Sequence, residues 1–303
     1  MKTLNKLGIM LFLGILAVST ASILIRNAQN FLPSNLVAAG RLIFATLILA
    51  PFTGKSALRE FFSLEHKQQV RILFAGIFLG IHFLVWIKSL ELTSIASSVI
   101  LVTTTPIWVA LFSPVFLKEK IAKNVMLGLT IAMIGIVVLF IGPSTRLQLA
   151  ALDLKTLFGN FLALVGAWMA AAYTMVGRSI RNDIPLKSYV FLVYGIAALV
   201  AALFAIPDMR SYSNAWIAGL PWIFLLGLVP QVMGHTLFNA AVRKMDAVYA
   251  SIALLGEPIG SILLAWIFLQ EKPGRYDLIG GLFVITGILL AFLLPKAPSQ
   301  ERL

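Results

Sequence analysis

Long runs of apolar residues, separated by short polar segments, follow one another from one end of the chain to the other. A helix needs about 20 mainly apolar residues to cross the hydrocarbon core of a bilayer. Ten runs reach about this length, at 7–25, 34–53, 71–90, 94–117, 124–142, 157–177, 186–206, 216–240, 247–269 and 276–294. The pattern therefore predicts an all-α integral membrane protein with ten transmembrane helices. It leaves no room for a soluble catalytic domain.

The composition agrees with this prediction. Hydrophobic residues make up 60% of the 303 residues and charged residues 12%, whereas soluble domains carry about 25% charged residues. The absence of cysteine excludes disulfides, iron–sulfur clusters, cysteine-ligated zinc and a cysteine nucleophile. Two histidines and one glutamate inside the spans lack a tight ligand spacing, so we expect neither a metal site nor a cofactor.

The basic residues lie mainly in short segments between the apolar runs. Their excess, 24 Lys and Arg against 12 Asp and Glu, would suggest nucleic-acid binding in a soluble protein, but here it indicates membrane topology. With a cytoplasmic N-terminus, 16 of the 24 fall on cytoplasmic segments. We therefore expect a multi-pass protein of the cytoplasmic membrane with both termini in the cytoplasm, lipids around it, and no nucleic-acid partner. The first run is longer than the apolar part of a typical signal peptide, which favours a retained helix.

The two halves of the chain resemble each other at a constant offset of 152 residues. Each half holds five spans, so the second half enters the membrane from the opposite side. The corresponding residues are Arg26, Asn30, Pro33, Pro106, Glu119, Gly128 and Gly135 in the first half and Arg178, Asn182, Pro185, Pro258, Glu271, Gly280 and Gly287 in the second. The sequence thus predicts two inverted five-helix repeats, residues 1–150 and 151–303, around a central cavity, as in many secondary transporters.

Pro106 and Pro258 interrupt the fourth and ninth spans at equivalent positions. A proline inside a helix removes one hydrogen bond and frees the carbonyl four residues earlier, here Val102 and Leu254. Within a bilayer such a carbonyl needs a partner or a wet cavity. Paired breaks indicate a transporter site with hinges at the two prolines. The structural alternative is a common membrane proline whose freed carbonyl is capped by the threonines at 103–105.

Two charged residues inside the spans allow more than one interpretation. Glu257 is the only acidic residue well inside a span, where an unpaired charge costs about 2.5–3.5 kcal/mol on insertion scales. It could couple protons, balance an amine, or be a neutral acid bonded to the carbonyl freed by Pro258. Arg41 lies in the outer part of the second span, and it either extends to the membrane surface or neutralises an anionic group.

Polar and aromatic residues at helical spacing mark further candidates. His82, Trp86 and Ser89 share a face, as do Gln231, His235 and Asn239; the two histidines correspond at offset 153, which predicts a short indel in the following loop. Each stripe faces either the cavity or a neighbouring helix. The candidate substrate-binding residues are His82, Trp86, Ser97, Thr104, Trp108, Asn160, Trp168, Gln231, His235, Asn239 and Glu257.

Two glycine pairs at a spacing of four, Gly76 with Gly80 and Gly256 with Gly260, permit close helix approach. We interpret them as packing within one chain rather than as a dimer contact.

Four stretches carry a family resemblance: Gly80-Ile81-His82-Phe83, Thr105-Pro106, Leu255-Gly256-Glu257-Pro258 and Leu269-Gln270-Glu271-Lys272. With the ten spans, they resemble the drug/metabolite transporter superfamily, specifically EamA-type permeases. The resemblance implies ten helices around a cavity walled mainly by spans one, three, four, six, eight and nine. It also implies small organic substrates, namely amino acids, other metabolites or drug-like amines.

The sequence as a whole predicts a secondary transporter of a small organic solute, directed outward, with protons as a candidate coupling ion. It does not predict an enzyme. The alternative from another class is a membrane-embedded enzyme acting on a lipid-linked substrate, which usually needs clustered Asp, Glu and His at a membrane face. A channel would need a continuous polar pore or a ring of charges, and neither pattern is present in the sequence.

Overall fold

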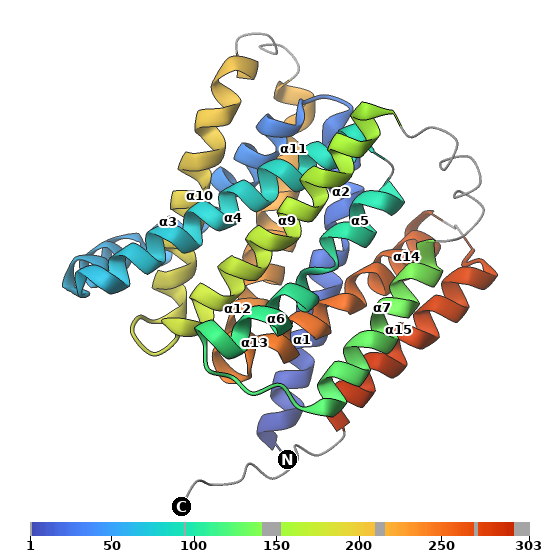
Figure 1. Ribbon diagram of the computed structural model, residues 1–303. Coiled ribbons are helices and arrows are strands. Elements are labelled where there is room, and N and C mark those ends of the chain that lie inside the picture. Colours follow the sequence, from blue (N-terminus) through green and yellow to red (C-terminus); the bar gives the residue numbers. More distant parts are fainter. Residues whose placement is uncertain (1, 94, 141–152, 210–215, 270–271, 294–303) are drawn as a thin grey trace, which may run out of the picture.

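The computed structural model describes residues 2–93, 95–140, 153–209, 216–269 and 272–293, which form helices and no strand (Figure 1). The helices are α1 (Lys2–Ser19), α2 (Ala21–Gln29), α3 (Ser34–Ser63), α4 (His66–Leu92), α5 (Ile95–Val102), α6 (Thr105–Phe116), α7 (Lys123–Phe140), α9 (Leu154–Ser179), α10 (Leu186–Met209), α11 (Trp216–Leu226), the π-helix η1 (Gly227–His235), α12 (Thr236–Lys244), α13 (Ala247–Ala253), the 3-10 turn η2 (Leu254–Gly256), α14 (Glu257–Leu269) and α15 (Arg275–Leu293).

Eight stretches of the described chain are long and apolar enough to cross a membrane. They are Leu7–Gln29, Ser34–Ser63, His66–Leu92, Ser97–Phe116, Leu154–Ser179, Leu186–Met209, Ile217–Lys244 and Ala247–Leu264. The other two predicted runs match shorter apolar helices, Lys123–Leu139 and Leu278–Phe292; the ends of these runs, 141–142 and 294, lie outside the described residues. The chain is thus an all-helical, multi-pass membrane protein.

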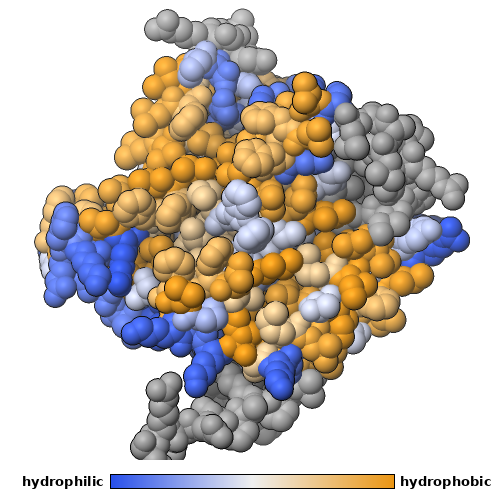
Figure 2. Space-filling model, viewed as in Figure 1, coloured by the Kyte–Doolittle hydropathy of each residue, from blue (hydrophilic) through white to orange (hydrophobic). Residues whose placement is uncertain are grey.

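Large apolar side chains cover the outside of the bundle. Phe52 is 80% exposed and Ile217 is 78% exposed. Exposure of such apolar side chains is unfavourable in water but not in lipid. Figure 2 shows an apolar surface over most of one face, with hydrophilic groups gathered near the junction of α3 and α4. The exposed surface therefore fits a bilayer, and the polar segments fit its boundary.

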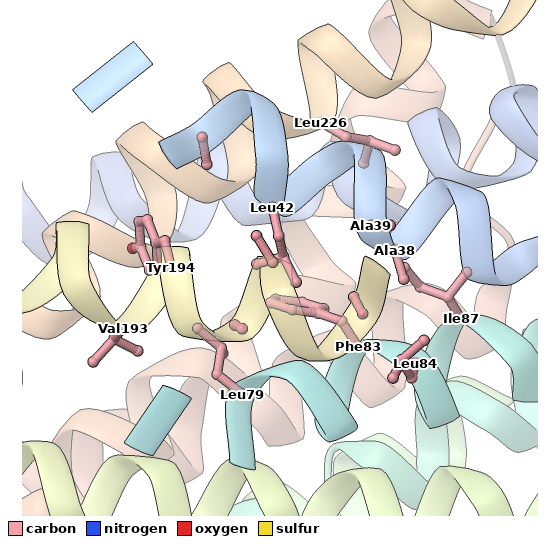
Figure 3. Packing of buried hydrophobic residues seen from close by; sticks show 14 of the residues in the cluster. Ala38, Ala39, Leu42, Leu79, Phe83, Leu84, Ile87, Val193, Tyr194 and Leu226 are labelled. Carbon is pink, nitrogen blue, oxygen red and sulfur yellow. The ribbon is translucent and has the colours of Figure 1, made fainter. Parts of the chain in front are cut away.

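The largest buried cluster joins α3, α4, α10 and α11 (Figure 3). Phe83 of α4 lies in it beside Leu42 of α3 and Leu79 one turn away, and all three are fully buried. Gly76 brings α4 against α10, because a Cβ there would stand 2.5 Å from the Cβ of Ile196. The predicted packing of this glycine pair within one chain is confirmed.

Helices α7 and α15 lie side by side (Figure 1) and meet through glycines. A Cβ on Gly128 would lie 2.5 Å from the carbonyl oxygen of Gly287, and one on Gly135 would lie 2.7 Å from that of Gly280. The lower-numbered glycine of each helix thus faces the higher-numbered one of the other, so the helices are antiparallel. Since Gly128 corresponds to Gly280 and Gly135 to Gly287, the contact is reciprocal, as at a two-fold axis. We call this contact the glycine seam.

The seam predicts different outcomes for two adjacent substitutions. In Gly280→Ala the new methyl would lie 2.6 Å from the backbone nitrogen of Leu139, and such overpacking costs about 1–3 kcal/mol. We expect thermal unfolding of the purified protein in detergent to begin several degrees lower. Gly281→Ala is the matched control because no atom lies within 4 Å of its Cβ position. Equal unfolding temperatures for both variants would contradict the seam.

Candidate functional site

Two spans are interrupted where the prolines predicted a break. Helix α5 ends at Val102 and α6 begins at Thr105, which puts Pro106 in the first turn of α6. At that position the missing N–H of proline has no helical partner to lose. The carbonyl of Val102 accepts a hydrogen bond of 2.8 Å from the Thr105 hydroxyl, so the threonine segment does cap the break.

The second interruption also lies just before a proline, but a different group holds its carbonyl. The 3-10 turn η2 separates α13 from α14, and Pro258 is the second residue of α14. The carbonyl of Leu254 accepts a hydrogen bond from the backbone N–H of Glu257. In the described part of the chain this backbone N–H holds the carbonyl, and no hydrogen bond joins the carboxyl of Glu257 to it.

A cavity of about 400 Å³ lies between these two breaks. Pro106, Thr105, Pro258 and Glu257 all line it. The six spans that the resemblance implied supply nearly the whole wall, while α3 adds Arg41 and α7 adds Leu139. The wall is mostly apolar, with hydroxyl groups and a few titratable side chains set into it.

The cavity wall follows the sequence repeat. Nine pairs of lining residues are related by the offset of 152. They are Val18 and Ala170, Ala21 and Tyr173, Ser22 and Thr174, Trp86 and Phe238, Val99 and Ser251, Val102 and Leu254, Thr103 and Leu255, Thr105 and Glu257, and Pro106 and Pro258. The same positions of each half therefore face one shared space.

Arg41 is fully buried and lines this cavity. Its guanidinium stands 4.0 Å from the centre of the Phe83 ring, and its Nε donates to Oε1 of Gln231 at 2.7 Å. Its Nη1 has no hydrogen-bond partner in the described part of the chain. The reading in which Arg41 extends to the membrane surface is wrong, because α3 turns this side chain into the bundle.

Both predicted histidines line the cavity. The Nδ1 of His82 lies 2.8 Å from the carbonyl oxygen of Gly166, so Nδ1 carries the proton and donates, and the ring stacks against Trp86. The Nδ1 of His235 has no partner among the described residues, and its ring meets the edge of Phe83. In the described part of the chain, neither Nε2 of His82 nor Nδ1 of His235 has a hydrogen-bond partner.

The predicted indel after the histidines is wrong. Helices α4 and α12 end at Leu92 and Lys244, and the next helices begin at Ile95 and Ala247, so both linkers hold two residues at the original offset. Instead, His235 closes the π-helix η1, whose turns hold more residues than those of an α-helix. The wider turn brings His235 to the cavity although it is one residue out of register with His82.

A largely buried ion cluster lies between the end of α9 and the start of α13. Arg178 of α9 donates to Glu119 at 2.6 Å and to Asp246 at 3.2 Å, and the other carboxylate oxygen of Glu119 accepts from the backbone N–H of Ala247 at 3.0 Å. Lys118, in left-handed conformation (φ 57°), ends α6 and turns the chain toward this cluster. The cluster joins the two halves.

The residues that correspond to Arg178 and Glu119 in the repeat are Arg26 and Glu271. Arg26 corresponds to Arg178 and borders a separate small pocket, formed with Ser22, Gln29 and Leu90. Glu271, which corresponds to Glu119, lies outside the described residues.

Comparison with known proteins gives the family. The sequence profile of the EamA-like transporter family matches residues 6–141 and again residues 157–293. The chain belongs to the EamA-like transporter family. One match falls inside each predicted repeat, while the predicted boundary at 150 and 151 lies outside the described residues.

Other transporters resemble this EamA-like chain along most of its length. The uncharacterized transporter YyaM of Bacillus subtilis is 24% identical over 100% of this chain and 99% of its own. The uncharacterized transporter YdfC of the same bacterium is 23% identical, over 88% of this chain and 83% of its own. A crystal structure of another protein superposes with a TM-score of 0.76 at 17% identity, covering 95% of this chain and 97% of that one, which shows a shared fold.

The predicted site residues fall into three groups in the EamA-like fold. His82, Trp86, His235 and Glu257 line the cavity together with Pro106 and Pro258. Gln231 and Asn239 lie behind the wall and hold lining residues, since Gln231 binds Arg41 and Asn239 donates to the Tyr173 hydroxyl.

The third group lies outside the lining residues and forms other contacts. Trp108 donates to the Thr104 hydroxyl at 3.1 Å and meets Trp168 edge-on. Asn160 accepts from the Thr93 hydroxyl at 2.7 Å, and Ser97 lies half-buried on α5. Substrate binding stays a prediction for every residue of the set.

Several lining residues were not among the candidates. Thr105 and Ser251 are plain hydroxyl residues in apolar spans, yet the repeat relates Thr105 to Glu257, so the offset alone could have identified it. Ser251 corresponds to Val99, and no comparable signal pointed to it. The depth and rotation of α3, which carry Arg41 inward, are set by packing that the sequence pattern does not encode.

The hydrogen bond between Arg41 and Gln231 predicts a stability effect. Gln231→Leu leaves the buried Nε without an acceptor, and a hydrogen bond to a charged group contributes about 1.5–3 kcal/mol. We expect a clear fall in the unfolding temperature in detergent. Gln231→Glu keeps an acceptor at the same distance and should retain stability. A wild-type unfolding temperature for the Leu variant would show that this bond does not hold Arg41.

Proposed function

We propose that this EamA-like protein is a secondary transporter that moves a small organic solute through the cavity between its halves by alternating access. The observation that carries the proposal is the set of nine repeat-related pairs around one cavity, with a proline break on either side. Two inverted five-helix repeats would provide two states of similar energy by exchanging roles. The reciprocal glycine seam supports this symmetry.

The Arg178 cluster provides the closed end of the cavity in this proposal. Tyr173 lines the cavity five residues before Arg178, and Ser251 lines it five residues after Asp246, a separation of about 7.5 Å along a helix. The cluster therefore lies directly beyond the cavity on both α9 and α13. Because Glu119 belongs to the first half and Arg178 to the second, opening this end requires breaking a buried ion pair between the halves.

The transport proposal is tested by reconstitution. We expect purified protein in liposomes to exchange at least one solute from a panel of labelled amino acids, organic amines and carboxylates faster than protein-free liposomes. Binding of that solute should also raise the unfolding temperature of the purified protein. Exchange no faster than in protein-free liposomes for every solute of a broad panel would contradict the proposal.

The closing role of the ion cluster is tested by labelling. The chain contains no cysteine, so Ser251→Cys introduces a single reactive thiol at a buried lining position. We expect Glu119→Gln to increase the labelling rate of this thiol several-fold when a membrane-impermeant maleimide is added on the side of the cluster.

Glu91→Gln is the control for this labelling experiment, because it removes the exposed ion pair of Glu91 with Lys88 at 2.8 Å without touching the cluster. An unchanged labelling rate in Glu119→Gln would show that the cluster does not close the cavity.

We also propose protons as the coupling ion, since Glu257, His82 and His235 all line the cavity and can exchange protons. An imposed pH gradient should then drive solute accumulation in liposomes, and Glu257→Gln should remove the response to the gradient. Accumulation that ignores the gradient in the wild-type protein would end the coupling proposal and leave transport itself untouched.

The location and direction rest on the charge distribution and on the resemblance. We propose that the protein lies in the cytoplasmic membrane with both termini in the cytoplasm, because that arrangement puts 16 of 24 basic residues on the inside. We propose export as the direction. The alternative of a membrane-embedded enzyme has no support from the family or its relatives, which are named as transporters.

A further inference from the structure

The two charged side chains of the cavity, Arg41 and Glu257, carry opposite signs and come from different halves. All other lining residues are apolar or uncharged polar groups, apart from the two histidines. The ion pairs within the described part of the chain do not include Arg41 with Glu257. Both side chains nevertheless line the same cavity of about 400 Å³.

Each of the two charges lacks a full set of partners. The Nη1 of Arg41 is buried without a hydrogen bond, while Nε is held by Gln231. No described hydrogen bond involves the carboxylate of Glu257, whose backbone N–H caps η2. Burying a charge without partners is costly in an apolar surrounding. A molecule that carries both an anionic and a cationic group could satisfy both side chains at once.

Neither charge is repeated in the other half. The residue that corresponds to Arg41 is Val193, which lies in the buried core, and the residue that corresponds to Glu257 is Thr105. The other eight lining pairs are uncharged in both halves, whereas the two charges give the cavity a direction. A bound molecule would be oriented by them rather than by the symmetric part of the wall.

We propose that the solute carried by this protein is a zwitterion, with a carboxylate held by Arg41, an ammonium group held by Glu257 and a small apolar remainder against Leu79, Trp86 and Phe238. This inference rests on the proposed transport function and assigns the substrate class of the same cavity. Arg41 is suited to the anion because its guanidinium is fixed by Gln231 and the Phe83 ring, so its free nitrogen is presented in a set direction.

Three sets of related molecules test the charge requirement. Leucine, valine and methionine are compared with the amines and the carboxylates obtained by removing one charged group from each, as competitors in exchange with labelled amino acid across liposomes. We expect the amino acids to exchange and the singly charged relatives to compete at least about tenfold more weakly, since each loses one charge-assisted contact. Equal competition by either singly charged set would overturn the zwitterion.

Substitutions then assign the two ends. Arg41→Gln should reduce amino-acid exchange at least about tenfold and remove the preference for amino acids over amines, while Glu257→Gln should remove the preference over carboxylates. Arg41→Lys should restore part of the exchange if charge is what matters. Arg59→Gln, exposed on the same helix, and Asp183→Asn, exposed between α9 and α10, are the matched controls and should behave as wild type.

The outcomes separate the two proposals. A change of selectivity cannot come from poor folding alone, because a misfolded protein loses exchange of all solutes alike. If another solute exchanges and no amino acid does, or if Arg41→Gln leaves selectivity unchanged, the zwitterion is wrong and transport stands. If nothing in the broad panel exchanges, the transport proposal fails instead.

Discussion

The requirement that every backbone polar group in a bilayer finds a partner governs this structure. A broken helix is tolerated only where local groups hold the exposed carbonyl, and the chain meets this need in two ways, with the Thr105 hydroxyl at one break and the Glu257 backbone N–H at the other. Both breaks face the cavity. The two irregular stretches of backbone therefore form part of the cavity wall.

The cavity and the glycine seam both follow the repeat that relates the two halves of the chain. At the seam, Gly128 lies against Gly287, and their counterparts Gly280 and Gly135 lie against each other across the antiparallel helices. Around the cavity, corresponding residues surround a common space, and the differences between them are chemical: Thr105 stands opposite Glu257 in the repeat, and Val99 opposite Ser251. A shared scaffold with local departures is how one fold serves unlike ligands.

The sequence predicted most of the fold because hydrophobic length and proline position act locally. The helical runs, both breaks and four lining residues followed from spacing alone. Arg41 did not, because its burial depends on how α3 rotates against α4 and α10, which only packing decides. Gln231 and Asn239 were placed on the right face but one layer back, since a stripe of polar residues does not reveal whether it meets a space or another side chain. The pairing of Trp108 with Thr104 and Trp168 is a contact between neighbours that periodicity cannot separate from a binding wall.

The glycine seam has a mechanical consequence. Because each glycine lies against the opposing backbone, sliding α7 along α15 by about one turn would move Ala132 or Val284 to a glycine's place, where there is no room for a side chain. Small rocking about the contact keeps the glycines together and meets no such obstacle. The seam therefore restricts sliding between α7 and α15, and in the proposed alternating access it would serve as the fulcrum.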